Sequence, residues 1–382
     1  MRGVGAWVKL AIPIAIVAAF YYVYDAPYTN WSGFLYFALG FAMAVYGAVL
    51  VGGWARNALV VVCSVLFFLA GAEAVAIFSE SRPIDIRPVG YSVSRPELGW
   101  GPQAPGVLHQ TKLEAKTRKI IFDVDYTIDA RRNRAVLSAA EGPTVAFFGD
   151  SMTFGTGLND AETLPQAFAD ATERRFQVRN LAFPGYGPQQ MLRALEIGLY
   201  DPVLKNSRLF VYQTAAWHAE RAACVSAFVL RAPRYVLVDG RPVYQGTCFG
   251  NWLPALGQLI ANTSLFRVFV SRTLRGVARE DIDLDIAMMI RAGTIAREKY
   301  DTPLAILYLP AGRGYLERSG YDEAQIMRRL RDGGLIVIDA ALKRENFPDQ
   351  PLAIPGDGHP TGVANRARAV LLRDHLASAS AR

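Results

Sequence analysis

The chain has 382 residues, of which 52% are hydrophobic and 20% are charged, and its formal net charge is +7. This composition excludes a disordered chain and argues against a wholly soluble protein. With three cysteines and four histidines, the chain is neither a disulfide scaffold nor a cysteine-rich zinc module, and a histidine-rich metal site is disfavoured. No basic run reaches five residues, so we attribute the positive charge to membrane topology and expect no nucleic-acid partner.

Three apolar runs occupy the first part of the chain, at residues 8–24, 31–53 and 57–78. A bilayer core needs about 20 apolar residues per helix, so each run is long enough or nearly so. The sequence therefore predicts a transmembrane domain of three spans at residues 1–78. A cleaved signal peptide would explain only the first run, and buried core helices are the alternative for all three.

Loop charges predict the orientation of these spans. Arg2 and Lys9 precede the first run and Arg56 lies between the second and third, whereas the first loop carries only Asp25. The positive-inside rule then places the N-terminus in the cytoplasm and everything after residue 78 outside it, in the periplasm of a bacterium. Glu73 lies about one turn from the outer end, where it would either snorkel to the interface or contact another membrane protein.

Residues 79–142 are predicted to form a connector and a small β-rich module. Five prolines between residues 83 and 105 disfavour helix. Residues 119–129 alternate between apolar and polar side chains, which is typical of a half-buried strand. We expect this module to pack against the following domain and predict no chemistry for it.

Residues 143–382 alternate between expected strands and helices. The strands are predicted at 144–148, 178–181, 208–213, 303–309 and 335–338, and the helices at 163–175, 189–199, 281–299, 323–331 and 361–376. Such alternation indicates an α/β domain with a parallel sheet and helices on both faces. Residues 222–280 interrupt it as an insertion, with a hairpin at 235–244 around Asp239-Gly240 and then an amphipathic helical stretch.

Two motifs follow predicted strands, where ligands bind in open parallel sheets. Ser151 follows Gly149-Asp150 directly after the first strand, so its hydroxyl could stand clear of the turn. The alternative is an ordinary loop in which the serine caps a helix. Gly185 follows the second strand in the sequence NLAFPGYG and could bring its N–H close to a ligand. The alternative is a simple turn glycine.

A third motif, PGDGHPT, precedes the last helix. A histidine activates a serine hydroxyl when a carboxylate fixes its tautomer and stabilises the imidazolium. Asp357 lies two residues before His359 and could do this locally. The alternative is a surface turn with a helix cap at Thr361.

Together the three motifs resemble the SGNH/GDSL hydrolase family over residues 143–376. The resemblance implies a three-layer α/β/α domain with a five-stranded parallel sheet of order 2-1-3-4-5. It implies that Ser151 is the nucleophile, that Asp357 and His359 complete the triad, and that the N–H groups of Ser151 and Gly185 form the oxyanion hole. It implies an ester hydrolase that needs no metal and no organic cofactor.

The sequence departs from the family pattern at two places. Asp357 and His359 are two residues apart, where the family spaces them by three. After the third strand the family's asparagine, an oxyanion donor, is absent, and losing one such donor can cost ~10²–10³ in rate. Gln213 or His218 could donate instead, and Arg221 could bind an anionic group of the substrate. Alternatively, His218 and Arg221 only order the loop.

These features predict a membrane-anchored serine esterase or deacylase that acts on an acyl ester of an extracytoplasmic carbohydrate or lipid. Transfer of the acyl group to a sugar stays open. The second hypothesis is a catalytically weak relative that binds glycans or assembles with a membrane acyltransferase.

The cysteines are predicted to differ in role. Cys63 lies within the third apolar run and should stay reduced. Cys224 and Cys248 flank the hairpin on the predicted outer side, where disulfides persist, so we expect a bond between them, with two unrelated thiols as the alternative.

Overall fold

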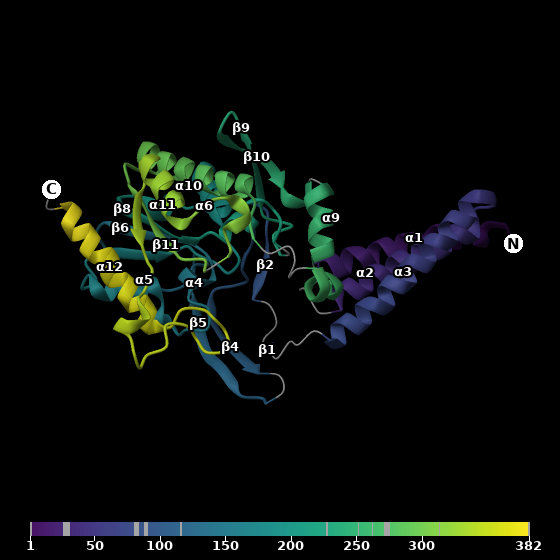
Figure 1. The fold of residues 1–382 in the computed structure, drawn as a ribbon, viewed down its shortest axis with the longest axis horizontal. Coiled ribbons are helices and arrows are strands. Elements are labelled where there is room, and N and C mark those ends of the chain that lie inside the picture. The colour runs from purple at the N-terminus through teal and green to yellow at the C-terminus, as the bar shows by residue number, and fades with distance from the viewer. Residues whose placement is uncertain are drawn as a thin grey trace. The chain divides into compact units, whose positions relative to one another are not determined.

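A computed structural model gives the fold (Figure 1). It describes residues 2–25, 31–79, 84–87, 91–114, 117–226, 228–250, 252–261, 263–270, 276–312 and 314–380. The chain divides into two compact units, which we call the helical unit (residues 1–82 and 256–275) and the sheet unit (residues 83–255 and 276–382). Most of the loop expected at 25–30 lies outside the described residues.

The helical unit contains two helices that are long and apolar enough to cross a membrane, among the residues described. Its helices are α1 (Arg2–Asp25), α2 (Ser32–Leu50) and α3 (Gly53–Ser79), and α2 and α3 meet the requirement. The prediction of three spans is therefore wrong by this measure. In α1 the apolar stretch is Ala11–Val23, which at 1.5 Å per residue extends roughly 20 Å against the ~30 Å of a bilayer core.

Glu73 of α3 is fully buried in the helical unit. Its carboxylate accepts hydrogen bonds from the backbone N–H groups of Ser264 (2.7 Å) and Leu265 (2.9 Å). These residues lie between α9 (Trp252–Ala261) and a π-helical turn (Phe266–Val270). Both expectations for Glu73 are therefore wrong, because a segment 191 residues away in the same chain satisfies it.

The sheet unit is built on five parallel strands in the order β7-β6-β8-β11-β12. Their bounds are β6 (Thr144–Phe148), β7 (Gln177–Asn180), β8 (Ser207–Ala215), β11 (Leu304–Leu309) and β12 (Ile336–Asp339). All five residues of β6 are buried, because helices cover both faces. The predicted α/β class and the parallel five-stranded sheet are confirmed.

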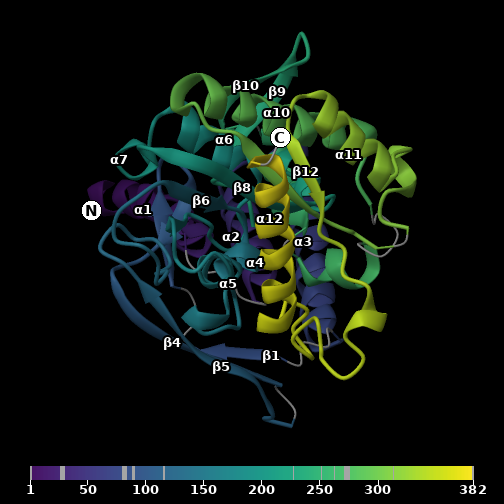
Figure 2. The same cartoon turned by 90° about the vertical axis from the view of Figure 1, so that its left-hand side faces the viewer.

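Helices cover the two faces of this sheet in two groups (Figures 1 and 2). The larger helices are α5 (Leu164–Ala171), α6 (Pro188–Glu196), α10 (Arg279–Tyr300), α11 (Glu323–Asp332) and α12 (Gly362–Ser380), and the short ones are α4 (Ser151–Phe154), α7 (Asp201–Leu204) and α8 (His218–Ala222). Val145 and Phe147 point to the core under α5 and α12, whereas Ala146 and Phe148 point to the core under α6, α10 and α11. This alternation follows from the two-residue period of a strand.

The module before the domain is part of the sheet unit. It holds an antiparallel sheet of order β1-β4-β5 and a hairpin of β2 and β3. The bounds are β1 (Ile84–Arg87), β2 (Ser92–Arg95), β3 (Gly99–Pro102), β4 (Gly106–Glu114) and β5 (Ile120–Ile128). Phe122 and Tyr126 of β5 join one core cluster with Phe154 and Phe183, so the inner face of β5 packs on the loops that follow β6 and β7. Pro83 and Pro88 lie outside the described residues.

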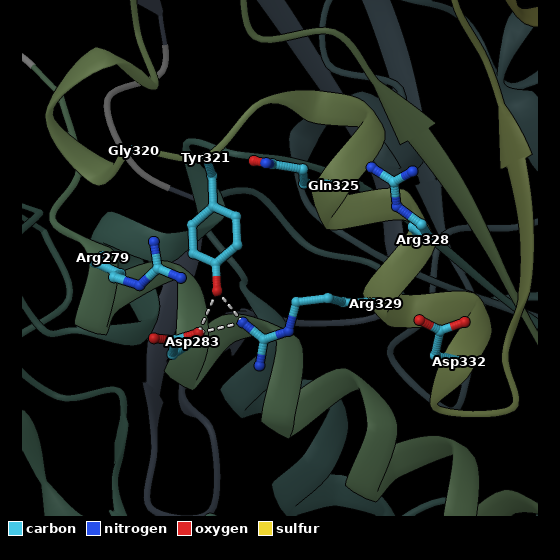
Figure 3. Close-up of a pocket in the computed structure, with 8 residues that line it drawn as sticks. All are labelled: Arg279, Asp283, Gly320, Tyr321, Gln325, Arg328, Arg329 and Asp332. Carbon is cyan, nitrogen blue, oxygen red and sulfur yellow. Dashed lines mark hydrogen bonds and ion pairs between the residues drawn. The ribbon is translucent and has the colours of Figure 1, made fainter.

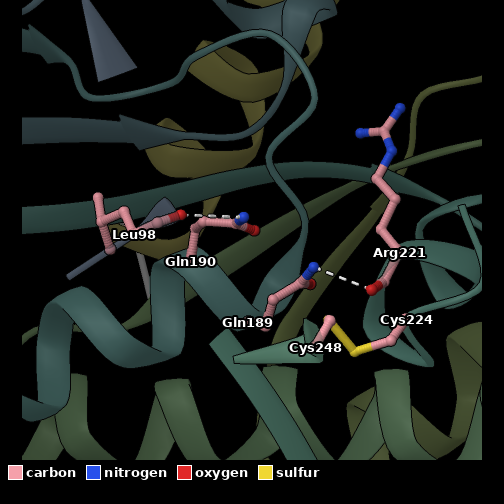
Figure 4. Close-up of a disulfide and its surroundings, with 6 residues drawn as sticks. All are labelled: Leu98, Gln189, Gln190, Arg221, Cys224 and Cys248. Atoms are coloured by element: carbon pink, nitrogen blue, oxygen red, sulfur yellow. Dashed lines mark hydrogen bonds between the residues drawn. A yellow bond between two sulfur atoms is a disulfide. The ribbon is translucent and has the colours of Figure 1, made fainter. Parts of the chain in front are cut away.

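The insertion forms the expected hairpin, with β9 (Pro233–Val238) and β10 (Arg241–Thr247) joined at Asp239-Gly240. Both turn residues have positive φ, 51° and 75°, as the tight turns of β-hairpins require. At its base Cys224 and Cys248 form a disulfide with a Cα–Cα distance of 5.6 Å (Figure 4). Cys63 is not bonded to another described cysteine.

Candidate active site

Ser151 lies at the carboxyl end of β6, as the first residue of α4. The turn before it depends on Gly149, whose φ is +149° and whose missing Cβ would collide with the side chain of Thr153. Asp150 caps the helix, because its Oδ1 accepts the backbone N–H of Met152 at 2.9 Å. The serine is therefore not the capping residue, and its hydroxyl is available for another partner.

That partner is His359, whose Nε2 lies 2.8 Å from the Oγ of Ser151. On the other side of the ring, Nδ1 lies 2.5 Å from Oδ2 of Asp357. Since the carboxylate accepts the Nδ1 proton, Nε2 is left to accept the proton of the serine hydroxyl. The structure thus brings together, in the order Ser–His–Asp, the three side chains that the motifs singled out.

Asp357 is more deeply buried than its partner His359: 1% of the Asp357 side chain is exposed, against 25% for His359. Burial alone would raise the pKa of Asp357, but the hydrogen bond from His359 and an ion pair with Lys112 together hold that pKa below its usual range. Lys112 belongs to β4, in the module for which no chemistry was predicted.

Gly185 follows β7 in a loop that is tied to the serine loop. Its φ is +84°, and a Cβ at this position would lie 3.1 Å from the ring of Trp100, so a side chain would crowd the loop. Trp100 also donates its Nε1–H to the carbonyl of Pro184 (2.9 Å). The N–H of Phe183 donates to the carbonyl of Gly149 at 3.3 Å, which joins the two loops directly.

The third loop, after β8, is organised around Asp150. This carboxylate is buried and accepts hydrogen bonds from Nε2 of His218 (3.1 Å) and Nη1 of Arg221 (2.9 Å). Burial would raise the pKa of Asp150, but Arg221 and His218 outweigh it and lower that pKa. The same Nη1 donates to the carbonyl of Tyr186 at 2.6 Å, so Arg221 links the serine loop to the loop of Gly185.

His218 is a structural residue in this arrangement. Burial, and next the charge of Arg221, lower its pKa, so its ring is neutral. Nε2–H then donates to Asp150, and Nδ1 accepts from the hydroxyl of Tyr212 at 2.7 Å. Because both nitrogens are engaged, the prediction that His218 donates to an oxyanion is wrong. The alternative, in which His218 and Arg221 order the loop, fits these contacts.

Gln213 of β8 is buried beside α4. Its Oε1 accepts the hydroxyl of Thr153 at 2.9 Å, and its Nε2 has no hydrogen-bond partner among the described residues. A buried amide N–H without a partner is uncommon. Gln213 therefore stays the candidate for the missing oxyanion donor.

A separate charged hollow of about 540 Å³ lies at α10, α11 and the turn before α11 (Figure 3). Two of its charges are paired with each other: Asp283 accepts the hydroxyl of Tyr321 at 2.7 Å and pairs with Arg329. None of its lining residues belongs to the loops that carry Ser151, Gly185 or His359. Within the described part of the chain, no group of three or more His, Cys, Asp or Glu side chains is placed to hold a metal ion.

No protein-family model matches the chain, and the search of curated proteins returns no match. Among solved structures, the psychrotrophic esterase EstA from Pseudoalteromonas sp. is 14% identical, with a TM-score of 0.37, and the match covers 63% of this chain and 100% of that one. A member of the lipolytic G-D-S-L family from Veillonella parvula DSM 2008 is 14% identical, with a TM-score of 0.36 and coverage of 61% and 97%. AlinE4, an SGNH-hydrolase family esterase, is 15% identical, with a TM-score of 0.33 and coverage of 63% and 98%.

These neighbours are an esterase, a lipolytic G-D-S-L family member and an SGNH-hydrolase family esterase, but the identities are low and every TM-score is below 0.4. The function of this chain must therefore be argued from its own residues.

Proposed function

We propose that the protein is a serine esterase that cleaves an acyl ester through a covalent acyl-enzyme. The observation that carries this proposal is the pair of hydrogen bonds that link Ser151, His359 and Asp357. Oγ of Ser151 lies 2.8 Å from Nε2 of His359, and Nδ1 of His359 lies 2.5 Å from Oδ2 of Asp357. Such an arrangement activates a weak nucleophile and supplies the acid for the leaving group.

The reaction follows from these contacts. Nε2 of His359 takes the hydroxyl proton as Oγ of Ser151 bonds to the ester carbonyl carbon. Asp357 stabilises the imidazolium that forms, while the N–H groups of Ser151 and Gly185 hold the negative carbonyl oxygen. The tetrahedral intermediate collapses, the bond to the alkoxy oxygen breaks, and His359 protonates the departing alcohol. His359 then deprotonates a water molecule, which attacks the acyl carbon of the acyl-enzyme. The bond from that carbon to Oγ of Ser151 breaks, His359 returns the proton to Oγ, and the carboxylic acid leaves.

We further propose that the sheet unit lies outside the cytoplasm. The disulfide between Cys224 and Cys248 supports an extracytoplasmic location, because such bonds persist in oxidising compartments. The proposed location is the same for two spans and for three. Three crossings from a cytoplasmic N-terminus, or two from an extracytoplasmic one, give the same location.

The substrate class follows from that location. An esterase anchored by α2 and α3 at the outer face of a membrane meets acylated carbohydrate and lipid of the cell envelope, so we propose an acyl ester of one of these. A sugar hydroxyl in place of water would make the same acyl-enzyme an acyltransferase intermediate.

A second candidate is a catalytically weak protein that binds glycans or assists a membrane acyltransferase. The observation that favours it is the missing asparagine after β8, where Gln213 is instead bonded to Thr153.

The test is hydrolysis of an activated short-chain acyl ester by the full-length protein in lipid nanodiscs. We expect turnover that is lost in Ser151→Ala. Thr156→Ala, a hydroxyl deletion at the next turn, is the matched control and should keep its activity. No turnover above the Ser151→Ala background would favour the second candidate.

A further inference from the structure

Lys112 is a lysine on the inner face of a strand. It lies in β4 directly opposite Phe122 of β5, and its side chain is 9% exposed. The neighbouring inward residues of β5, Phe122, Val124 and Tyr126, are all buried. An ammonium group in such a place is costly unless an opposite charge pairs with it.

The opposite charge is Asp357. Oδ1 of this carboxylate pairs with Nζ of Lys112, while Oδ2 accepts the Nδ1 proton of His359. Both carboxylate oxygens are therefore engaged, one by the catalytic histidine and one by a residue 245 positions earlier in the chain.

The β4–β5 hairpin also contacts the chain on the serine side. The N–H of Gly157 donates to the hydroxyl of Tyr126 (2.8 Å), which in turn donates to Oε1 of Gln110 on β4 (2.8 Å). Gly157 fits between Phe122 and Ile354, where a Cβ would lie 2.9 and 2.8 Å from their side chains. The hairpin thus touches both the segment after α4 and the loop that carries Asp357.

We infer that the β4–β5 hairpin is part of the catalytic centre and that Lys112 is a positioning residue, which holds Asp357 in place and moderates the negative charge that His359 experiences. This inference rests on the proposed function. Three titratable side chains face Asp357: His359 on its own loop, Lys112 on β4 and Tyr126 on β5. Burial, with a contribution from Asp357, raises the pKa of Tyr126 to about 12, so Tyr126 is neutral near pH 7 and Lys112 supplies the cation.

The sign of the effect follows from these charges. Without the ammonium group, the carboxylate would act on His359 with its full negative charge and favour the protonated ring. Because the ring must be deprotonated to accept the serine proton, the acid limb of the pH–rate profile would move to higher pH. For two charges on opposite sides of one carboxylate, at an effective dielectric constant of about 20–40, the shift is on the order of one pH unit.

The experiment compares three variants of the full-length protein in nanodiscs by kcat and KM across pH. Lys112→Met removes the charge at similar length, Lys112→Arg keeps it, and Lys119→Met removes an exposed lysine just before β5. For Lys112→Met we expect kcat to fall roughly 10–100-fold, less than the ~10⁴-fold seen when the aspartate of a triad is replaced by its amide, with KM within about twofold. In Lys112→Met the acid limb of the pH–rate profile should move about one pH unit higher. Lys112→Arg should have its acid limb at the pH of the parent, and Lys119→Met should match the parent throughout.

An unchanged kcat and acid limb in Lys112→Met would overturn the inference. An equal loss of kcat in Lys112→Met and Lys112→Arg, with the acid limb of the pH–rate profile unmoved, would also overturn the inference. That pattern would indicate that Lys112 contributes only by packing. A readout without turnover separates this failure from failure of the proposed function: the ring titration of His359, followed by NMR of isotope-labelled histidine and assigned with His359→Gln. If the parent does not hydrolyse esters but Lys112→Met raises the titration midpoint, the positioning role stands and the esterase proposal fails.

Discussion

Replacing both Cys224 and Cys248 with alanine should destabilise the sheet unit by an amount that the structure predicts. The bond joins residues 24 apart in sequence, and the chain-entropy relation gives about 3.5 kcal/mol for a loop of this length. A unit of this size loses roughly 2 °C in Tm per kcal/mol, so we expect a decrease of about 7 °C.

The disulfide also bears on the candidate site. α8 ends at Ala222, two residues before Cys224, and it presents His218 and Arg221 to Asp150. Nε2 of Gln189 on α6 donates to the carbonyl of Arg221 at 3.0 Å, beside the disulfide (Figure 4). Loss of the covalent link should therefore lower ester hydrolysis below the unfolding temperature as well as lowering that temperature.

The assay is near-UV circular dichroism of the full-length protein in nanodiscs during heating, with and without reductant. Reductant should bring the parent to the Tm of the double variant and leave the double variant unchanged, and Cys63→Ala should behave like the parent. Two results would contradict a stabilising disulfide: a shift of less than about 1 °C when reductant is added to the parent, or free thiols at both positions by non-reducing peptide mapping of protein taken from membranes.

Three further outcomes are expected. Arg221→Met removes the guanidinium that pairs with the buried carboxylate of Asp150 and leaves that carboxylate with hydrogen bonds from His218 and the backbone N–H of Met152. The variant should therefore lose about 3–5 kcal/mol of stability in chemical denaturation, and a loss below 1 kcal/mol would contradict this role. Burial raises the pKa of Asp285, whose Oδ1 has no hydrogen-bond partner among the described residues. The stability that this carboxyl group contributes is therefore present below its pKa in the unfolded chain and is lost as pH rises through its pKa in the folded protein. Asp285→Asn should therefore be more stable than the parent at pH 8 but not at pH 4, and a pH-independent difference would argue against the assignment. A reporter that is active only in the periplasm, fused after residue 382, should be active, whereas activity of a cytoplasm-only reporter there would place the sheet unit on the other side.

Local patterns in the sequence were sufficient for the parts of the fold that depend on neighbours in the chain. The run TVAFF predicted β6 at residues 144–148, because a strand covered on both faces is apolar along nearly its whole length. The hairpin at Asp239-Gly240 was also predicted from a local pattern, because its turn needs residues that accept positive φ. A serine directly after a strand end, and a histidine two residues from an aspartate before the last helix, were enough to single out Ser151 and His359.

Contacts between distant parts of the chain could not be predicted in this way. Lys112 meets Asp357 across 245 residues and Glu73 meets Ser264 across 191, and neither pair leaves a periodic signal. His218 was misassigned because the sequence does not reveal that Tyr212 and Asp150 occupy both of its ring nitrogens. The alternation in 119–129 did predict β5, but not that the strand paired with it carries a cation to the candidate site.

Trapping the acyl-enzyme is the decisive experiment for Ser151 as the nucleophile. Full-length protein would be incubated with a fluorophosphonate and, separately, with an activated acetyl ester followed by rapid acid quench, and its peptides would be analysed by mass spectrometry. We expect a single adduct on the peptide that contains Ser151, absent in Ser151→Ala and formed far more slowly in His359→Ala. Ester hydrolysis that persists in Ser151→Ala, or an adduct on another residue while Ser151 stays unmodified, would contradict this assignment.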